Sequence, residues 1–488
     1  MVKVPGPTAQ RLAAVAAAVA VAALFYFRPE TRPSALMRDF NAFYCAGAAL
    51  DRGADPYRAE PLGSCERAPR PAWLSRGIPN LSAPAPLPPY ALAPFTALAR
   101  LPYALAAIAW GITILLAFLV TVAVMRRLTN LPFAAITAAF VLGDGYAAWT
   151  LGQVAPIAVA AIALAAYFIT HDRPVAAATA VAFATIEPHV ALPAALALFL
   201  WCPRARIALV LAGVTLGAIS IAVGGWQFNL EYLRQVLPAH ALSELANSRQ
   251  LSLAAVLHRI GASDALALRL GEISYAAMLA FSLWAAPVVA RRTSCPALIV
   301  TLPVALTLLG GPFGHVVQVA AALPCAFLLY RNVPSARVAL GLAVVALSIP
   351  WVQFSSLGTV LPVAAAAVAA ALTATLVDRR PMAIAIAALG ALGIFKAISL
   401  LVTQRVPDAS KALAAAYDPH ALAQASWTLY VGFVGPWNLA AFDLARLPTW
   451  LGLLALAIVG ARVAIGAPSL QVPAPTKRGY TSHRPTEV

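Results

Sequence analysis

The chain has 488 residues, of which 61% are hydrophobic and only 11% are charged, whereas about 25% of the residues in an ordinary soluble domain are charged. This composition excludes a water-soluble enzyme. Lys and Arg outnumber Asp and Glu by 34 to 18, but because apolar runs recur along almost the whole chain, the excess indicates membrane topology rather than binding to nucleic acid. The five cysteines lack the spacing of a zinc module.

Segments of the length that crosses a bilayer recur along the chain. The first of them is interpreted as an uncleaved anchor. They are predicted at about 10–27, 103–125, 131–149, 151–169, 205–223, 272–290, 337–354, 357–377, 381–402 and 449–466.

Two longer apolar stretches, 174–202 and 296–330, are each interrupted by a polar centre. The first centre is Glu187-Pro188-His189, and the second runs from Gly310 to His315. Short connections rich in Arg stay in the cytoplasm, and such connections flank both stretches. Each stretch is therefore predicted to be a hairpin whose centre points to the outer face.

These patterns predict an all-α, polytopic membrane protein of about 11–14 transmembrane segments with both termini in the cytoplasm. We expect residues 1–466 to form a single transmembrane domain and residues 467–488 to form a disordered cytoplasmic tail. Three long outer loops, at 28–102, 224–271 and 403–448, are expected to bear short amphipathic helices.

Asp39 is the first candidate for chemistry. It lies in the first outer loop between aliphatic and aromatic neighbours, where partial desolvation would raise its basicity and suit it to general-base catalysis. The structural alternative is a helix N-cap, with a helix opening at Phe40.

Glu187, His189 and His315 are predicted at the two hairpin centres on the outer face. An ionisable side chain at membrane depth is retained when it is paired, hydrated or functional, and broken helices at that depth line cavities. Either histidine could donate a hydrogen bond to a phosphate oxygen. The alternative is that both centres simply reach water among the lipid headgroups.

Three more polar side chains are candidates for binding. Gln153 follows a cluster of aromatic residues, a combination typical of carbohydrate contact or of an interfacial aromatic belt. Arg249 and Arg259 lie in the second outer loop, where a guanidinium would bind either a substrate phosphate or anionic lipid headgroups. In the first outer loop, Cys45 and Cys65 could form a disulfide.

Short motifs between about residues 35 and 330 follow an order that resembles glycosyltransferase family 87 of the GT-C superfamily, whose members are polyprenyl-phosphate-dependent membrane enzymes. The matching positions are, in chain order, Asp39-Phe40, Phe43-Tyr44, Ala46-Gly47, Gly53, Asp55-Pro56-Tyr57, Pro88-Pro89, Leu101-Pro102, Trp110, Leu151-Gly152-Gln153-Val154, the stretch around Pro188, Asn247 to Leu253, and Pro312 to His315.

The resemblance implies a GT-C-like fold and transfer of a mannose- or arabinose-like sugar from a polyprenyl-phosphate donor to a lipid or glycan acceptor. Asp39 matches the aspartate taken to be the general base in relatives such as the mycobacterial mannosyltransferases, and Tyr44 lies in the same motif. Two positions depart from the family pattern. Glu187 stands where many members have Lys, and Leu87 stands where Tyr usually precedes the two prolines.

The sequence therefore predicts an inverting hexosyltransferase of the cytoplasmic membrane whose active site faces outward. No cofactor is implied. Glu187 could orient His189, bind acceptor hydroxyls or bind a divalent ion. No metal site and no nucleic-acid partner are predicted. The alternative from another class is a transporter or flippase of a lipid-linked or small polar substrate, because transporters also contain broken helices with polar centres.

Overall fold

The computed structural model describes residues 8, 10–15, 36–74, 77–145, 151–247, 250–311, 314–349, 360–377, 410–434 and 439–466. Within these ranges the ordered elements are helices, and the extended pairings are two isolated bridges, Leu36 with Leu74 and Arg58 with Leu422. The all-α prediction is confirmed. The predicted disordered tail at 467–488 lies outside the described residues.

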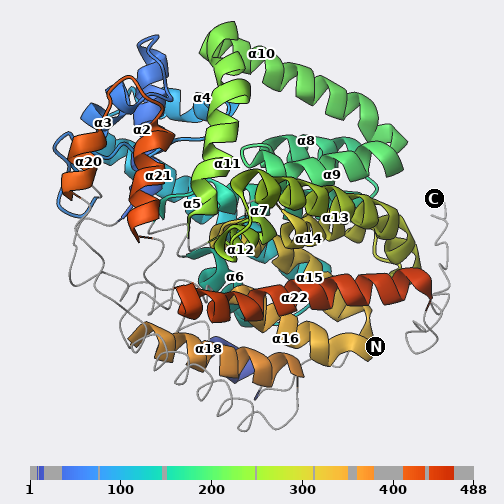
Figure 1. Ribbon diagram of the computed structural model, residues 1–488. Coiled ribbons are helices and arrows are strands. Elements are labelled where there is room, and N and C mark those ends of the chain that lie inside the picture. The colour runs from blue at the N-terminus through green and yellow to red at the C-terminus, as the bar shows by residue number, and fades with distance from the viewer. Residues whose placement is uncertain are drawn as a thin grey trace.

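The helices shown in Figure 1 follow one another through the chain with short connections in the middle and long connections near the ends. The α-helices are α2 (Arg38–Asp51), α3 (Ala59–Arg67), α4 (Pro89–Leu98), α5 (Tyr103–Thr129), α6 (Phe133–Gly145), α7 (Ala155–Thr170), α8 (Pro174–Ala184), α9 (Pro188–Trp201), α10 (Arg206–Glu231), α11 (Leu237–Leu245), α12 (Leu253–Arg259), α13 (Asp264–Thr293), α14 (Leu298–Gly310), α15 (Leu323–Asn332), α16 (Arg337–Ser348), α18 (Val360–Val377), α20 (Ser410–Ala416), α21 (Ala423–Val434) and α22 (Leu439–Ile465). Short 3-10 or π segments join some of them: η2 (Pro203–Ala205), η3 (Tyr232–Val236), η4 (Val316–Ala322) and η5 (Pro334–Ala336).

Several of these helices are long and apolar enough to cross a membrane. In the described part of the chain they are Tyr103–Thr129, Pro203–Leu245, Asp264–Thr293 and Arg446–Ile465, and a fifth span arises if Val316–Asn332 and Pro334–Ser348, which meet at 113°, are counted as one. Shorter apolar helices such as α7 and α14 pack between them. The protein is therefore a polytopic membrane protein, while its total of 11–14 segments stays a prediction.

Both interrupted stretches contain a break where the sequence predicted one. α8 ends at Ala184 and α9 begins at Pro188, because a proline at the first helical position lacks the N–H that would continue the preceding helix. α14 ends at Gly310, and the chain turns through Gly314 and His315 before η4 begins. The first stretch is thus two short helices joined by a polar turn, and in the second a polar turn separates α14 from η4 and α15.

The first and third long connections form one lobe, which we call the capping lobe and define as residues 36–98 and 410–434. In Figure 1 the blue helices α2 to α4 lie beside the orange-red α20 and α21. The backbone N–H of Ala59 donates to the carbonyl of Ala421 at 2.8 Å, and that of Ala423 donates to the carbonyl of Tyr57 at 2.9 Å. These bonds hold segments together that are more than 300 residues apart in sequence.

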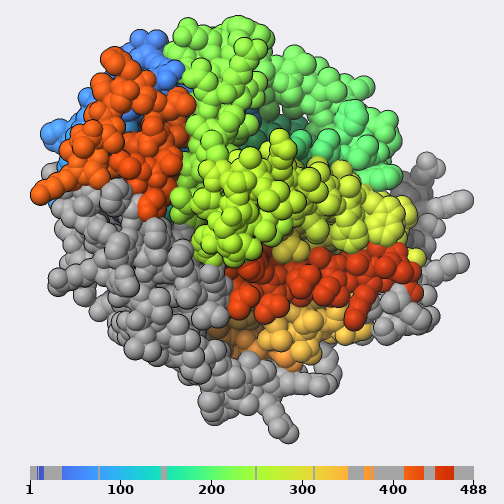
Figure 2. All heavy atoms as spheres, in the orientation of Figure 1, coloured from blue at the N-terminus to red at the C-terminus, as the bar shows by residue number. Residues whose placement is uncertain are grey.

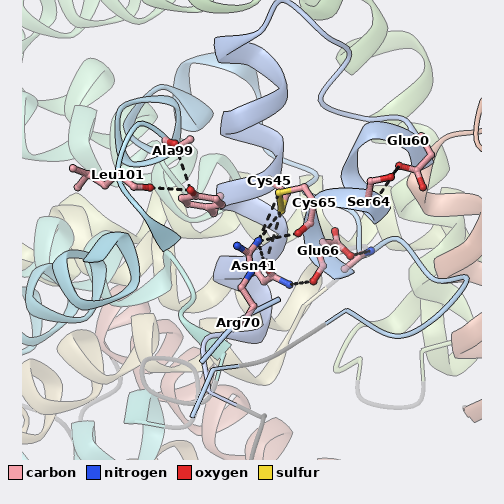
Figure 3. Close-up of a disulfide and its surroundings, with 11 residues drawn as sticks. Asn41, Cys45, Glu60, Ser64, Cys65, Glu66, Arg70, Ala99 and Leu101 are labelled. Atoms are coloured by element: carbon pink, nitrogen blue, oxygen red, sulfur yellow. Dashed lines mark hydrogen bonds between the residues drawn. A yellow bond between two sulfur atoms is a disulfide. The ribbon is translucent and has the colours of Figure 1, made fainter. Parts of the chain in front are cut away.

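The helix that carries Asp39 is fastened within the capping lobe by a disulfide between Cys45 and Cys65 (Figure 3). The pairing considered from the sequence is therefore confirmed. Asn41 Nδ2 also donates to the carbonyl of Glu66 at 3.2 Å. A side chain at Gly47 would meet the backbone of Phe95 at 2.4 Å, so this glycine allows α2 to lie directly on α4.

Helix α10 stands apart from the rest of the bundle. Only 11% of the apolar window in Pro203–Leu245 is buried, and side chains such as Ile207, Val214 and Trp226 are exposed. Gly225, at φ 58° and ψ −177°, breaks the helical path, after which the chain descends through η3 and α11 (Figure 1). Figure 2 shows the surface recessed beneath this arch.

Candidate active site

One cavity of about 1460 Å³ opens between the capping lobe, the two broken hairpins, and helices α10, α11 and α13. Its polar lining comes from elements that are distant in sequence, and it brings together most of the candidates derived above. The polar and charged side chains on the wall of this chamber include Arg38, Asp39, Gln153, Glu187, His189, His240, Glu244, His315 and Gln318.

Asp39 lies in the first turn of α2 rather than before it. The N-cap position is Met37, and no side chain caps the helix, so the N-cap interpretation of Asp39 is wrong. Its carboxylate instead accepts a hydrogen bond from Gln153 Nε2. Burial raises the pKa of Asp39 above its ordinary value, although the Gln153 hydrogen bond and the Arg38 charge lower it. The carboxylate is therefore more basic than that of a solvated aspartate.

Gln153 reaches Asp39 because the preceding turn is held rigidly. Gly152 has φ +69°, a conformation that L side chains rarely adopt, and its carbonyl accepts a hydrogen bond from Trp110 Nε1 at 2.8 Å. A Cβ atom at Gly152 would lie 2.8 Å from Phe40 Cβ. The Phe40 ring stacks on Trp110 with centroids 6.0 Å apart, so this aromatic cluster sets the Gln153 position.

The first helix break contributes Glu187 and His189. Glu187 is buried and lies 3.6 Å, measured from Oε2, from His189 Nδ1. It also accepts a hydrogen bond of 3.5 Å from Gln318 Nε2. Because Gln318 belongs to η4, this bond connects the first helix break to the second.

The second helix break contributes His315, which is held on two sides. Its backbone N–H donates to Gln318 Oε1 at 3.0 Å, in a capping box that opens η4. The ring Nε2 atom lies 3.0 Å from Gln250 Nε2. Gln250 Oε1 in turn accepts the backbone N–H of Gly314 at 2.7 Å. Both hairpin centres therefore meet in one chamber, joined by amide side chains.

Two functional candidates in the cavity were not recognised as a pair in the sequence. His240 and Glu244 lie one helical turn apart on α11, with His240 Nδ1 4.0 Å from Glu244 Oε1. Their spacing of four residues on an amphipathic segment was the available signal. The partner Trp427, whose Nε1 donates to Glu244 Oε1 at 3.1 Å, comes from α21 and could not be paired with them from the sequence.

A comparison with protein-family models indicates the class of reaction. Residues 87–312 match the model of glycosyltransferase family 87. The resemblance is confirmed: this is a membrane glycosyltransferase. The match covers slightly less than half of the chain, and it includes Gln153, Glu187 and His189 but neither Asp39 nor His315. The comparison with curated proteins gives no match, and neither does the comparison with solved structures.

Some predicted binding residues of the glycosyltransferase lie elsewhere. The Tyr44 hydroxyl donates to the carbonyl of Leu101 at 2.9 Å, and the ring packs inside the capping lobe rather than on the cavity wall. Arg259 does not line the cavity either, and Arg249 lies outside the described residues. Arg38 is the single Arg or Lys among the described residues that line the cavity.

The Asp55-Pro56-Tyr57 motif of the glycosyltransferase has a supporting role. Asp55 Oδ1 accepts the backbone N–H of Tyr57 at 2.9 Å, and Asp55 Oδ2 pairs with Arg58 Nε at 3.0 Å. Arg58 also pairs with Glu231 at the end of α10. The buried Tyr57 hydroxyl donates to the carbonyl of Leu87 at 3.0 Å, which fixes the proline-rich segment along the cavity wall.

Proposed function

We propose that this glycosyltransferase transfers a mannose- or arabinose-like sugar from a polyprenyl-phosphate donor to a lipid or glycan acceptor. The reaction takes place at the outer face of the cytoplasmic membrane and inverts the anomeric centre, with Asp39 as the general base. The sugar class and the orientation follow from the motif order and from the arginine distribution of the sequence.

The observation that carries this proposal is that both polar and apolar side chains line the cavity. Its wall carries polar side chains such as those of Asp39, Glu187 and His315, whereas its lining from α10 is mostly apolar. The lining along α10 extends from Gly213 to Ile221, which is about 12 Å at 1.5 Å per residue. Such a chamber matches a ligand with a charged, hydroxylated head and a hydrocarbon tail.

The apolar part faces the hydrocarbon layer through small side chains. No heavy atom lies within 4 Å of where a Cβ would stand at Gly213 or Gly217, so α10 leaves open space there. Leu192 and Ala195 of α9 and Leu268 of α13 line the facing walls. A polyprenyl chain can lie between these helices while its phosphate and sugar reach the polar part.

The transfer requires a base for the acceptor hydroxyl. We assign this role to Asp39, which takes the hydroxyl proton as the acceptor oxygen bonds to the anomeric carbon and the bond from that carbon to the phosphate oxygen breaks. The polyprenyl phosphate leaves, and Asp39 ends the step protonated. The Gln153 amide holds the carboxylate in place through its hydrogen bond.

The departing phosphate requires positive charge or hydrogen-bond donors. Arg38 follows Met37 directly before Asp39 and lines the same chamber, so its guanidinium is placed for this role. His189 and His315 are the further donors on the cavity wall. Arg38 therefore compensates for the absence of Lys at position 187.

The experiment is the Asp39→Asn variant of the full-length protein, assayed in nanodiscs with a polyprenyl-phosphate sugar and its acceptor. Loss of a general base costs about 100-fold to 10,000-fold in rate, so we expect transfer to fall at least 100-fold with unchanged thermal stability. Asp51→Asn, on the same helix but paired with Arg100 outside the cavity, is the matched control. Full activity of Asp39→Asn would refute the base assignment, and retention of anomeric configuration in the product would refute inversion.

A further inference from the structure

Three side chains with metal-ligating atoms converge on one side of the cavity. They are His240 and Glu244 of α11 and His315 before η4, and each offers a ligand atom within 4.8 Å of the other two. Glu244 lies between the two imidazoles, with Oε1 4.0 Å from His240 Nδ1 and Oε2 3.6 Å from His315 Nε2. Zinc binds nitrogen and oxygen at about 2.0–2.2 Å, so ligand atoms in a tetrahedral site lie roughly 3.4 Å apart. Small side-chain shifts would therefore close this cluster around an ion.

The backbone supports this arrangement from two directions. His240 and Glu244 are four residues apart on one helix, so they project from the same face. His315 approaches from the second hairpin, where the capping box with Gln318 fixes its backbone. Two ligands from a helix and one from a separate rigid turn leave further coordination positions facing the cavity, which all three residues line.

The carboxylate in the middle is oriented by its own hydrogen bonds. Trp427 Nε1 donates to Oε1 of Glu244 at 3.1 Å, while Asn247 Nδ2 and Gln250 Nε2 donate to Oε2 at 2.7 Å and 2.6 Å. The Glu244 side chain is only 3% exposed. A carboxylate has about four acceptor positions, and the donors among the described residues occupy one on Oε1, the oxygen nearer His240, and two on Oε2. Hydrogen-bonded ligands of this kind are typical of metal sites.

The charge of the whole chamber gives a second, independent reason for a cation. The described lining contains five carboxylates but Arg38 alone of the Arg and Lys residues. A phosphate-bearing donor would therefore enter a chamber with more carboxyl groups than cationic side chains, and a divalent cation would bind that phosphate. This step rests on the proposed function. The five carboxylates are those of Asp39, Glu187, Glu244, Asp264 and Glu272.

We propose that His240, Glu244 and His315 bind a divalent cation of the zinc class. Two imidazoles and one carboxylate suit Zn²⁺, which keeps an open position in sites with three protein ligands. Mg²⁺ and Ca²⁺ prefer oxygen ligands throughout. In the glycosyltransferase the open position faces the cavity, where a phosphate oxygen of the donor is the ligand that fits.

The test is direct metal binding to the full-length protein, purified with a tag that contains no histidine and stripped with a chelator. We expect isothermal titration with ZnCl₂ to show one Zn²⁺ per chain that MgCl₂ does not displace, and Zn²⁺ to raise the melting temperature. His240→Ala, Glu244→Gln and His315→Ala should each weaken binding at least 10-fold. His171→Ala is the matched control, because this histidine is exposed, lies just past the C-terminal end of α7, and has its ring Nδ1 2.8 Å from the carbonyl oxygen of Tyr167.

Binding of Zn²⁺ that is equal in His240→Ala and His171→Ala, or no stoichiometric binding at all, would overturn the metal site. A Glu244→Gln protein that melts like the wild type in the absence of Zn²⁺ shows that lost binding is not caused by misfolding. The transfer assay with the stripped protein separates the two proposals. Transfer at an unchanged rate without bound Zn²⁺ overturns the role of the cation in holding the donor phosphate and leaves the enzyme proposal standing. Stoichiometric Zn²⁺ binding without transfer from any polyprenyl-phosphate donor overturns the enzyme proposal and leaves the metal site standing.

Discussion

Replacing Gly152 with alanine tests whether the turn before Gln153 positions the carboxylate of Asp39, the proposed general base. The turn has φ +69°, and an alanine in the left-handed region costs about 1–2 kcal/mol. The new Cβ would also lie 2.7 Å from Met37 Sδ and 2.8 Å from Phe40 Cβ. The methionine end can move, but Phe40 is fully buried, so overpacking adds about 1–3 kcal/mol.

The matched control is Gly53→Ala. Gly53 has the same φ of +69°, yet no heavy atom lies within 4 Å of where its Cβ would stand. Both variants therefore carry the same backbone strain, and only Gly152→Ala carries the clash. We expect Gly152→Ala to lose about 1–3 kcal/mol more unfolding free energy than Gly53→Ala, measured by denaturant unfolding in detergent.

The transfer rate should separate the two variants more strongly than stability does. A displacement of about 1 Å at a catalytic group can reduce the rate about 100-fold, and the clash moves the peptide that carries Gln153 away from Asp39. Gly53→Ala should retain wild-type transfer, because Gly53 is exposed and lies two residues beyond the end of α2. Equal melting and equal transfer rates in the two alanine variants would refute the role of this turn.

The pH dependence gives two further predictions. Because burial raises the pKa of Asp39, and only the ionised carboxylate accepts a proton, kcat/KM should fall as the pH drops through a value above 3.8, the ordinary aspartate pKa. Burial also raises the pKa of Glu66 from 4.5 to about 8. Between these two pH values the folded state holds a proton on Glu66 that the unfolded state releases. The free energy of unfolding that this proton contributes is therefore fully present below pH 4.5 and is lost as the pH rises toward about 8. The Glu66→Gln variant should remove this loss in pH-dependent melting curves.

Each pH prediction has an internal control. The Gln153 hydrogen bond lowers the Asp39 pKa, so Gln153→Ala should shift the acidic limb of kcat/KM to higher pH, and an unmoved limb would assign it to another group. Glu60, on the same helix as Glu66, has its pKa lowered to about 2 by hydrogen bonds from Ser64, Tyr417 and Arg67. Glu60→Gln should therefore destabilise at pH 7, and the Glu66 argument fails if both glutamine variants shift melting in the same direction.

The sequence was sufficient for the class of fold and for the location of the helix breaks. Apolar length, arginine placement and prolines at positions such as Pro188 are local properties, and each acts within one or two helical turns. The same local reading misjudged the start of α2, where Met37 rather than Asp39 occupies the N-cap. Tyr44 and Arg259 were predicted to bind substrate, and neither lines the cavity, because the direction in which a side chain faces in the folded bundle cannot be read along a single chain.

What only the tertiary structure decided is which polar groups share the chamber. The Glu244 carboxylate has nearby hydrogen-bond donors in Asn247 and Gln250, yet it also accepts a hydrogen bond from Trp427, which lies 183 residues further along the chain. Likewise, Gln318 links Glu187 to His315 across two separate hairpins. The sequence by itself determines where helices form and break, since those preferences are local, whereas the pairing of distant side chains depends on how the helices pack against one another and on the desolvation that the packing produces.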